Sequence, residues 1–90
     1  MPYIKAKDRE KYNSLIEDII DELTDHGFKP FEVGDLNYII SKICWELFDK
    51  NRRYKTGNDI LGVLSGVEKE FYRRKLGIYE DEKVKSEGDI

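Results

Sequence analysis

The spacing of apolar positions along the chain predicts helices and no strands. Three long stretches repeat apolar residues at intervals of three and four, the period of a helix with one apolar face. No stretch alternates apolar and polar residues as a half-buried strand would. We therefore predict an all-α protein, a small bundle of three main helices followed by a short C-terminal helix.

The first main helix is predicted over residues 15–25, after an irregular N-terminal segment. Ser14 and Glu17 match a start signature in which a side-chain hydroxyl accepts from a free backbone N–H. One face is aliphatic: Leu15, Ile16, Ile19, Ile20 and Leu23. Acidic residues cover the other side, and we expect Gly27, just after His26, to cap the end.

The second main helix is predicted over residues 34–50, after a break at Pro30, because the residue before a proline avoids helix. Its aliphatic stripe comprises Leu36, Ile39, Ile40, Ile43, Leu47 and Phe48. Tyr38 and Trp45 lie two turns apart and project almost opposite this stripe. A helix with two apolar faces is either central in its domain or half of an interface.

The third main helix is predicted over residues 56–76. Thr56 and Asp59 match the same start signature. The apolar stripe comprises Ile60, Leu64, Val67 and Phe71, and the cations of the last turn are Arg73, Arg74 and Lys75. Cations suit the carbonyl end of a helix, and Gly77 is predicted to end it in a left-handed conformation.

Gly62 and Gly66 are unusual inside this third helix, since each costs about 1 kcal/mol relative to alanine. They share one face, which lies nearly opposite the apolar stripe. A smooth strip of backbone would let a second helix approach closely, within the fold or in a dimer. A ligand lying against the bare backbone is the alternative. The helix carries too many charges for a membrane helix pair.

The C-terminus carries the whole net charge of the protein. Residues 80–90 hold five acidic and two basic side chains, and the 90-residue chain has a net charge of −3. We expect a short helix over residues 78–85 and a loosely held acidic tail over residues 80–90. In residues 1–79 the acidic and basic side chains are equal in number, so this part of the chain lacks the basic excess of a dedicated nucleic-acid binder.

The length of 90 residues predicts a single domain over residues 1–90. Cys44 is the only cysteine, so an intramolecular disulfide is excluded and a reducing compartment is favoured. The N-terminus lacks the apolar core of a signal peptide, and no apolar run has the roughly 18 residues of a membrane span. We expect a cytoplasmic protein with no membrane partner.

No group of residues predicts catalysis, a metal or another cofactor. His26 is the only histidine, and Cys44 has neither a histidine nor clustered cations near it in sequence, so we expect an inert buried thiol. The alternative is a Mg²⁺-dependent all-α nucleotide pyrophosphohydrolase, in which carboxylates of two helices hold the metal ions. The motif residues would be Glu17, Asp18, Asp21, Glu46 and Asp49. Because 19 of the 90 residues are acidic, such a match arises easily by chance.

Two clusters mix aromatic and basic side chains. The first comprises Arg52, Arg53 and Lys55, with Tyr54 between them, and the second comprises Lys69, Tyr72, Arg73, Arg74 and Lys75. Stacking together with phosphate contacts would suit single-stranded nucleic acid. The alternative is a set of helix-end charges, with Glu70 paired internally to the arginine four residues later.

Tyr38 and Trp45 are the most informative surface candidates, because tyrosine and tryptophan are enriched in binding hot spots. They could be covered by the chain itself, by a second copy or by another protein. We therefore expect a non-catalytic helical protein-interaction module, with a homodimer as one form of it, through this face or through Gly62 and Gly66. Nucleic acid is the alternative partner, and no small-molecule substrate is evident.

Three segments carry a resemblance to a known family: PYIKAKDR at the start, GDLNYII in the second helix, and EFYRRKLGIYEDEKVKSEGD near the end. With these the whole chain resembles a small family of uncharacterised proteins from archaea, bacteria and phages. Relatives tend to have proline at the position of Ile78, which implies a new helix there. The resemblance implies an all-helical fold and no catalytic residues. The phage connection favours nucleic-acid or regulatory roles only by association.

Overall fold

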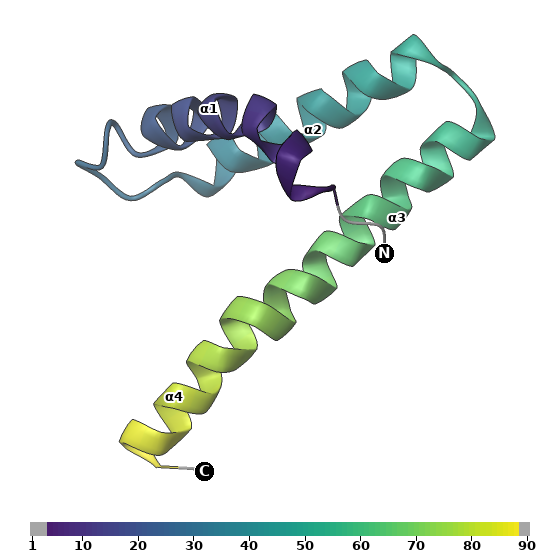
Figure 1. The fold of residues 1–90 in the computed structure, drawn as a ribbon. Helices are drawn as coiled ribbons and strands as arrows, with labels where there is room; N and C mark the ends of the chain where they lie inside the picture. The colour runs from purple at the N-terminus through teal and green to yellow at the C-terminus, as the bar shows by residue number, and fades with distance from the viewer. Residues whose placement is uncertain (1–3, 89–90) are drawn as a thin grey trace. The chain divides into compact units, whose positions relative to one another are not determined.

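The computed structural model describes residues 4–88, which form helices joined by turns, with no strand in that range (Figure 1). The elements are α1 (Ala6–Leu23), α2 (Val33–Lys50), α3 (Tyr54–Phe71), η1 (Tyr72–Leu76) and α4 (Gly77–Glu87). The all-α prediction is confirmed. The chain divides into two compact units, Met1–Leu47 and Phe48–Ile90. The single domain over residues 1–90 stays a prediction.

Helix α1 begins nine residues earlier than predicted, at Ala6, and Ser14 lies in its interior. The predicted start at Ser14 is therefore wrong. The first turn is held without it: the Asp8 N–H donates to the Lys5 carbonyl at 2.9 Å, and Arg9 Nε donates to the Ile4 carbonyl at 2.9 Å. The helix thus extends through residues 6–14, where we expected an irregular start with at most a short helical turn from Ala6.

The end of α1 is built around Thr24. Its hydroxyl donates to the Ile20 carbonyl at 2.8 Å and accepts from the Gly27 N–H at 3.1 Å. Asp25, His26 and Gly27 all have positive φ angles, of 48°, 55° and 90°. Gly27 thus has the predicted left-handed conformation, but the chain leaves the helix after Leu23 and is already left-handed at Asp25.

Helix α3 begins at Tyr54, so the predicted start at Thr56 is wrong. Asp59 is engaged instead by Lys55, whose ammonium donates to its carboxylate at 2.8 Å. This hydrogen bond, and then the negative charge of Asp59, raise the pKa of Lys55. The ion pair lies along the helix surface, where such pairs contribute little to stability.

Gly77 does not end the third helix, so the stop predicted there is wrong as well. Its φ and ψ angles are −61° and −42°, which is right-handed helix. The Gly77 N–H donates to the carbonyl of Tyr72, five residues earlier, so η1 is a π-helical turn. Helices α3 and α4 are joined through η1 into one helix of residues 54–87 (Figure 1). Residues 80–87 of the expected tail belong to this helix, and residues 89–90 lie outside the described range.

The π turn carries the apolar stripe of α3 onward. In a continuous α-helix, Leu76 would point about 140° away from Phe71, because five residues add 500° of turn. In a π turn, residues five apart lie nearly above one another. Leu76 therefore continues the stripe past Phe71, and Tyr79 continues it one turn later.

Neither unit has a closed apolar core, since no residue between 4 and 88 is buried. The half-buried apolar side chains are Ile19, Leu23, Leu36, Ile39, Phe48 and Ile60. Much of each predicted stripe is open to solvent: Leu15 is 60 % exposed, Leu47 52 % and Phe71 59 %. Cys44, predicted to be buried, is half-buried.

The exposed area is large for a chain of this mass. The chain exposes 8355 Å². Two separate compact units of half its mass would together expose about 6,600 Å², from the scaling of accessible surface with mass. The excess of about 1,700 Å² therefore remains even if the two units never touch. It is as large as the total area of a standard protein interface.

Candidate interaction surfaces

Tyr38 and Trp45 on α2 form the first candidate surface. Their exposed fractions are 63 % and 64 %, so both keep most of their area in contact with solvent. Two helical turns separate them, which places both on one face of α2. The structure therefore presents an open Tyr38/Trp45 surface on α2.

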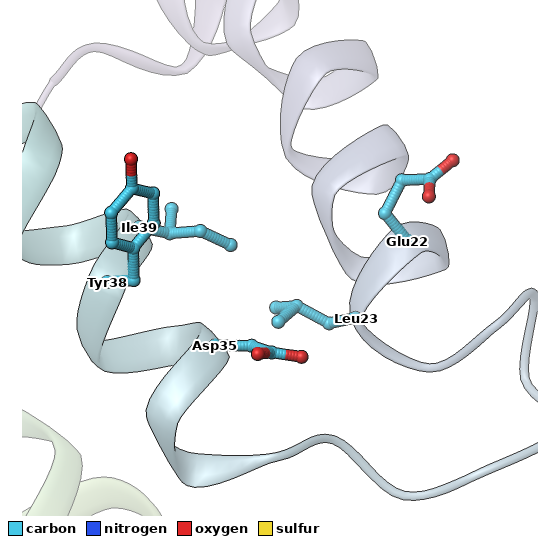
Figure 2. A pocket seen from close by; sticks show the side chains of 5 residues that line it. All are labelled: Glu22, Leu23, Asp35, Tyr38 and Ile39. Carbon is cyan, nitrogen blue, oxygen red and sulfur yellow. The ribbon is translucent and has the colours of Figure 1, made fainter.

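A pocket of about 280 Å³ borders this surface between α1 and α2. It is lined by Glu22, Leu23, Asp35, Tyr38 and Ile39. Figure 2 shows the side chains of Leu23 and Ile39 directed toward the gap between the helices, with the carboxylate of Glu22 turned away. The pocket thus has an apolar floor, two acidic groups and no basic group in its lining.

Gly62 and Gly66 lie inside α3 as predicted. A Cβ added to Gly62 would meet nothing within 4 Å, while Gly66 is half-buried. Within the described residues, no neighbouring group therefore requires glycine at position 62. The strip around Gly62 is open backbone surface.

A second pocket, of about 450 Å³, lies at the turn between α2 and α3. It is lined by Phe48, Arg52, Arg53, Tyr54, Gly57, Asn58 and Leu61. The α3 members recur at intervals of three and four, so they share one face. Gly57 leaves room for the Phe48 ring, which would lie 3.6 Å from a Cβ at that position.

The arginines of this basic pocket are held by nearby groups. The Arg52 guanidinium lies 5.3 Å from the centre of the Phe48 ring and pairs with Asp49 at 2.8 Å. Arg53 Nε donates to the Asn51 side-chain oxygen at 3.0 Å. Tyr54 is 91 % exposed, so its ring is free to stack on a ligand. The structure thus brings both predicted arginines and an open aromatic ring to one pocket.

The second predicted basic cluster is partly neutralised by its own helix. Glu70 accepts from Arg73 at 3.0 Å and from Arg74 at 2.8 Å, which confirms the predicted internal pair and adds Arg73 to it. The Tyr72 hydroxyl donates to Glu80 at 3.4 Å. The negative charge of Glu80 and this hydrogen bond raise the pKa of Tyr72. Arg73, Arg74 and Tyr72 thus already contact carboxylates of their own helix. The pocket at the α2–α3 turn is therefore the better candidate for nucleic-acid binding.

Sequence analysis missed one surface, the C-terminal half of the long helix's stripe. Val67 and Phe71 belong to the predicted apolar stripe, and their exposed fractions are 55 % and 59 %, against 37 % for Leu64 one turn earlier. Leu76 and Tyr79 extend this open stripe, and their exposed fractions are 42 % and 53 %. The interval of five between Phe71 and Leu76 was the signal in the sequence, because it breaks the helical period where η1 lies.

Residues 4–88 of the structure contain neither a cluster of metal ligands nor a membrane-spanning helix. Among residues 4–88, no group of three or more His, Cys, Asp or Glu side chains is arranged to hold a metal ion. None of the helices in this range combines the length and the apolar character needed to cross a membrane.

A family model matches the chain over residues 1–90, and the chain belongs to that family, described as a domain of unknown function (DUF6899). No curated protein and no solved structure matches the chain.

Proposed function

We propose that this chain is a non-catalytic helical interaction module that functions as a homodimer. Its partner surfaces are the Tyr38/Trp45 surface of α2 and the open stripe of the long helix. The observation that supports the proposal most strongly is the lack of any buried residue between 4 and 88 in a chain rich in exposed apolar side chains. Such exposure marks interaction surfaces.

The area supports an obligate partner. If each chain covered its excess of about 1,700 Å², a dimer would bury about 3,400 Å² in total, which lies within the range of obligate homodimers. Below about 70–80 residues a single core contributes little stability, and oligomerisation is a common remedy. Each of the two compact units, Met1–Leu47 and Phe48–Ile90, is shorter than that. Folding and self-association would then be coupled.

Light scattering on a size-exclusion column, across a series of protein concentrations, tests this proposal. We expect a molar mass near twice the 10.7 kDa of the chain, and a melting temperature that rises with concentration. A folded monomer at every concentration would contradict self-association. The partner would then have to be a different protein.

A second candidate function is association with single-stranded nucleic acid through the basic pocket. The observation that favours it is the juxtaposition of Arg52, Arg53 and the 91 % exposed ring of Tyr54 in one pocket. Stacking on an aromatic ring beside cations is a common mode of single-strand binding. Its test is binding of labelled oligonucleotides at low salt.

A further inference from the structure

The long helix combines an open apolar stripe with two charge blocks on either side of Gly77. The basic block before it comprises Arg73, Arg74 and Lys75, and the acidic block after it comprises Glu80, Asp81 and Glu82. The stripe is most open in the same region, from Val67 to Tyr79. Apolar exposure and a reversal of charge therefore coincide at the π turn.

We propose that two copies of this chain pair their α3–η1–α4 helices antiparallel, around a two-fold axis near Gly77. This rests on the proposed self-association and specifies its surface and orientation. Antiparallel pairing about that axis places the basic block of each copy beside the acidic block of the other. Two-fold symmetry repeats the match on both sides of the axis.

Parallel pairing of the same stripe would be repulsive. It would set cations against cations before Gly77 and anions against anions after it. Individual surface ion pairs contribute little, about 0 to 1 kcal/mol. Whether the facing charge blocks attract or repel each other nevertheless selects the orientation of the two helices. The stripe supplies the attraction, and the charge blocks decide which arrangement forms.

The antiparallel overlap has a definite extent. An axis near Gly77 sets residue 67 opposite residue 87, so the overlap covers residues 67–87, or about 30 Å of helix. The exposed large apolar residues in this overlap are Val67, Phe71, Tyr72, Leu76, Ile78, Tyr79 and Val84. Leu64 and Ile60 lie before it and are the better covered part of the stripe. The pairing thus covers the part of the stripe that the chain leaves open.

Lys75 and Glu82 are the most suitable charges for a test. Lys75 directly precedes Leu76, and Glu82 follows Tyr79 by three residues and points about 60° away from it, so both flank the open stripe. Neither makes a hydrogen bond or an ion pair with the described part of the chain. Lys69 lies two residues before Phe71 and therefore points about 160° away from it, on the opposite side of the helix.

The experiment compares Lys75→Glu and Glu82→Lys, alone and mixed in equal amounts, by analytical ultracentrifugation at low salt. Each single variant should raise the dissociation constant of the dimer about tenfold, because two symmetric contacts become repulsive. The mixture should recover wild-type affinity as a heterodimer. Lys69→Glu introduces the same charge change on the far side and should have no effect.

The outcomes separate this inference from the proposed function. A wild-type chain that stays monomeric contradicts both. A wild-type dimer that is unaffected by Lys75→Glu and Glu82→Lys, or weakened equally by Lys69→Glu, overturns only the antiparallel pairing. The relative orientation of the two paired helices is also tested by disulfide formation between two copies of a chain that carries Ser86→Cys and Cys44→Ser. A disulfide at that position forms between parallel helices, whereas antiparallel pairing keeps the two cysteines far beyond bonding distance.

Discussion

A Cβ atom on Gly77 would lie 2.9 Å from the backbone carbonyl oxygen of Tyr72 and 3.5 Å from Cε1 of its ring. Cβ atoms essentially never lie this close to another heavy atom of this kind. The same carbonyl accepts the Gly77 N–H across the π turn. Glycine is thus required here by a close approach to backbone, while its own backbone conformation is ordinary helix.

We predict that Gly77→Ala destabilises the protein, against the usual gain of about 1 kcal/mol when alanine replaces a helical glycine. The added methyl group must push apart backbone that cannot rotate away. Overpacking of this kind costs about 1–3 kcal/mol in the free energy of unfolding. Urea denaturation followed by circular dichroism measures the change. An increase in stability would mean that the π turn relaxes without cost.

We predict the opposite sign for Gly62→Ala, the matched control. Position 62 is open, with nothing within 4 Å of an added Cβ. Alanine should therefore raise the free energy of unfolding by about 1 kcal/mol through helix propensity alone. The same urea titration measures it, together with the molar mass. Loss of the dimer in this variant would locate the subunit interface on the glycine strip.

We predict an alkaline titration for Tyr72 above the ordinary tyrosine pKa of about 10. The negative charge of Glu80, then its hydrogen bond, raise the pKa of Tyr72 and keep its hydroxyl protonated in the folded chain. The folded state then holds a proton that the unfolded state has released. This contribution to stability is complete below the ordinary pKa and is lost as pH rises through the higher folded value.

The phenolate absorbance difference between wild type and Tyr72→Phe isolates this titration from those of the other tyrosines. Glu80→Gln should move it to lower pH, because the repelling charge is gone while a hydrogen-bond acceptor remains. Identical titrations with and without the Glu80 charge would show that the contact is absent in solution.

We predict that Trp45→Ala weakens self-association, because 64 % of this side chain is exposed in the single chain. Trp45 is also the only tryptophan, so its fluorescence reports on this surface alone. Emission of the wild type should shift to longer wavelength on dilution as subunits separate. Tyr54→Ala, at an even more exposed aromatic in the other unit, is the control. No spectral change over the dissociation range would exclude Trp45 from the interface.

We predict that any binding of single-stranded oligonucleotides depends on the basic pocket and weakens steeply with salt. Arg53→Ala should reduce the affinity. It should also reduce the slope of log affinity against log salt concentration by about one, because one phosphate contact is lost. Tyr54→Ala should reduce the affinity at every salt concentration, since stacking is not electrostatic. Fluorescence anisotropy across a salt series measures both effects. No binding at low salt would eliminate nucleic acid as a partner.

Apolar periodicity was sufficient to predict the helices. Helix α2 was predicted over residues 34–50 and is observed over Val33–Lys50. The start and stop signals were less informative, because short motifs also occur inside helices. Ser14 fits a cap motif but lies in a helix already begun at Ala6. The stop predicted at Gly77 failed for a different reason, since a glycine needed for a close approach looks the same in sequence as one needed for a left-handed turn.

The candidate surfaces were only partly predictable. The outward direction of Tyr38 and Trp45 follows from their spacing alone. Which aliphatic residues remain exposed does not, because periodicity shows that a face is apolar and not whether anything covers it. The sharing of Glu70 between two arginines also depends on side-chain geometry within η1, which the sequence pattern leaves open.

The π turn also determines where the long helix can tolerate a change in length. A π turn is equivalent to an α-helical turn with one extra residue. Deleting Lys75 would let η1 close as an ordinary α-helix, with the residues on both sides keeping their directions. Deleting Ser65, in the middle of α3, would instead rotate everything beyond it by about 100° and break the apolar stripe. Natural length variants of this helix are therefore expected to gain or lose a residue within η1.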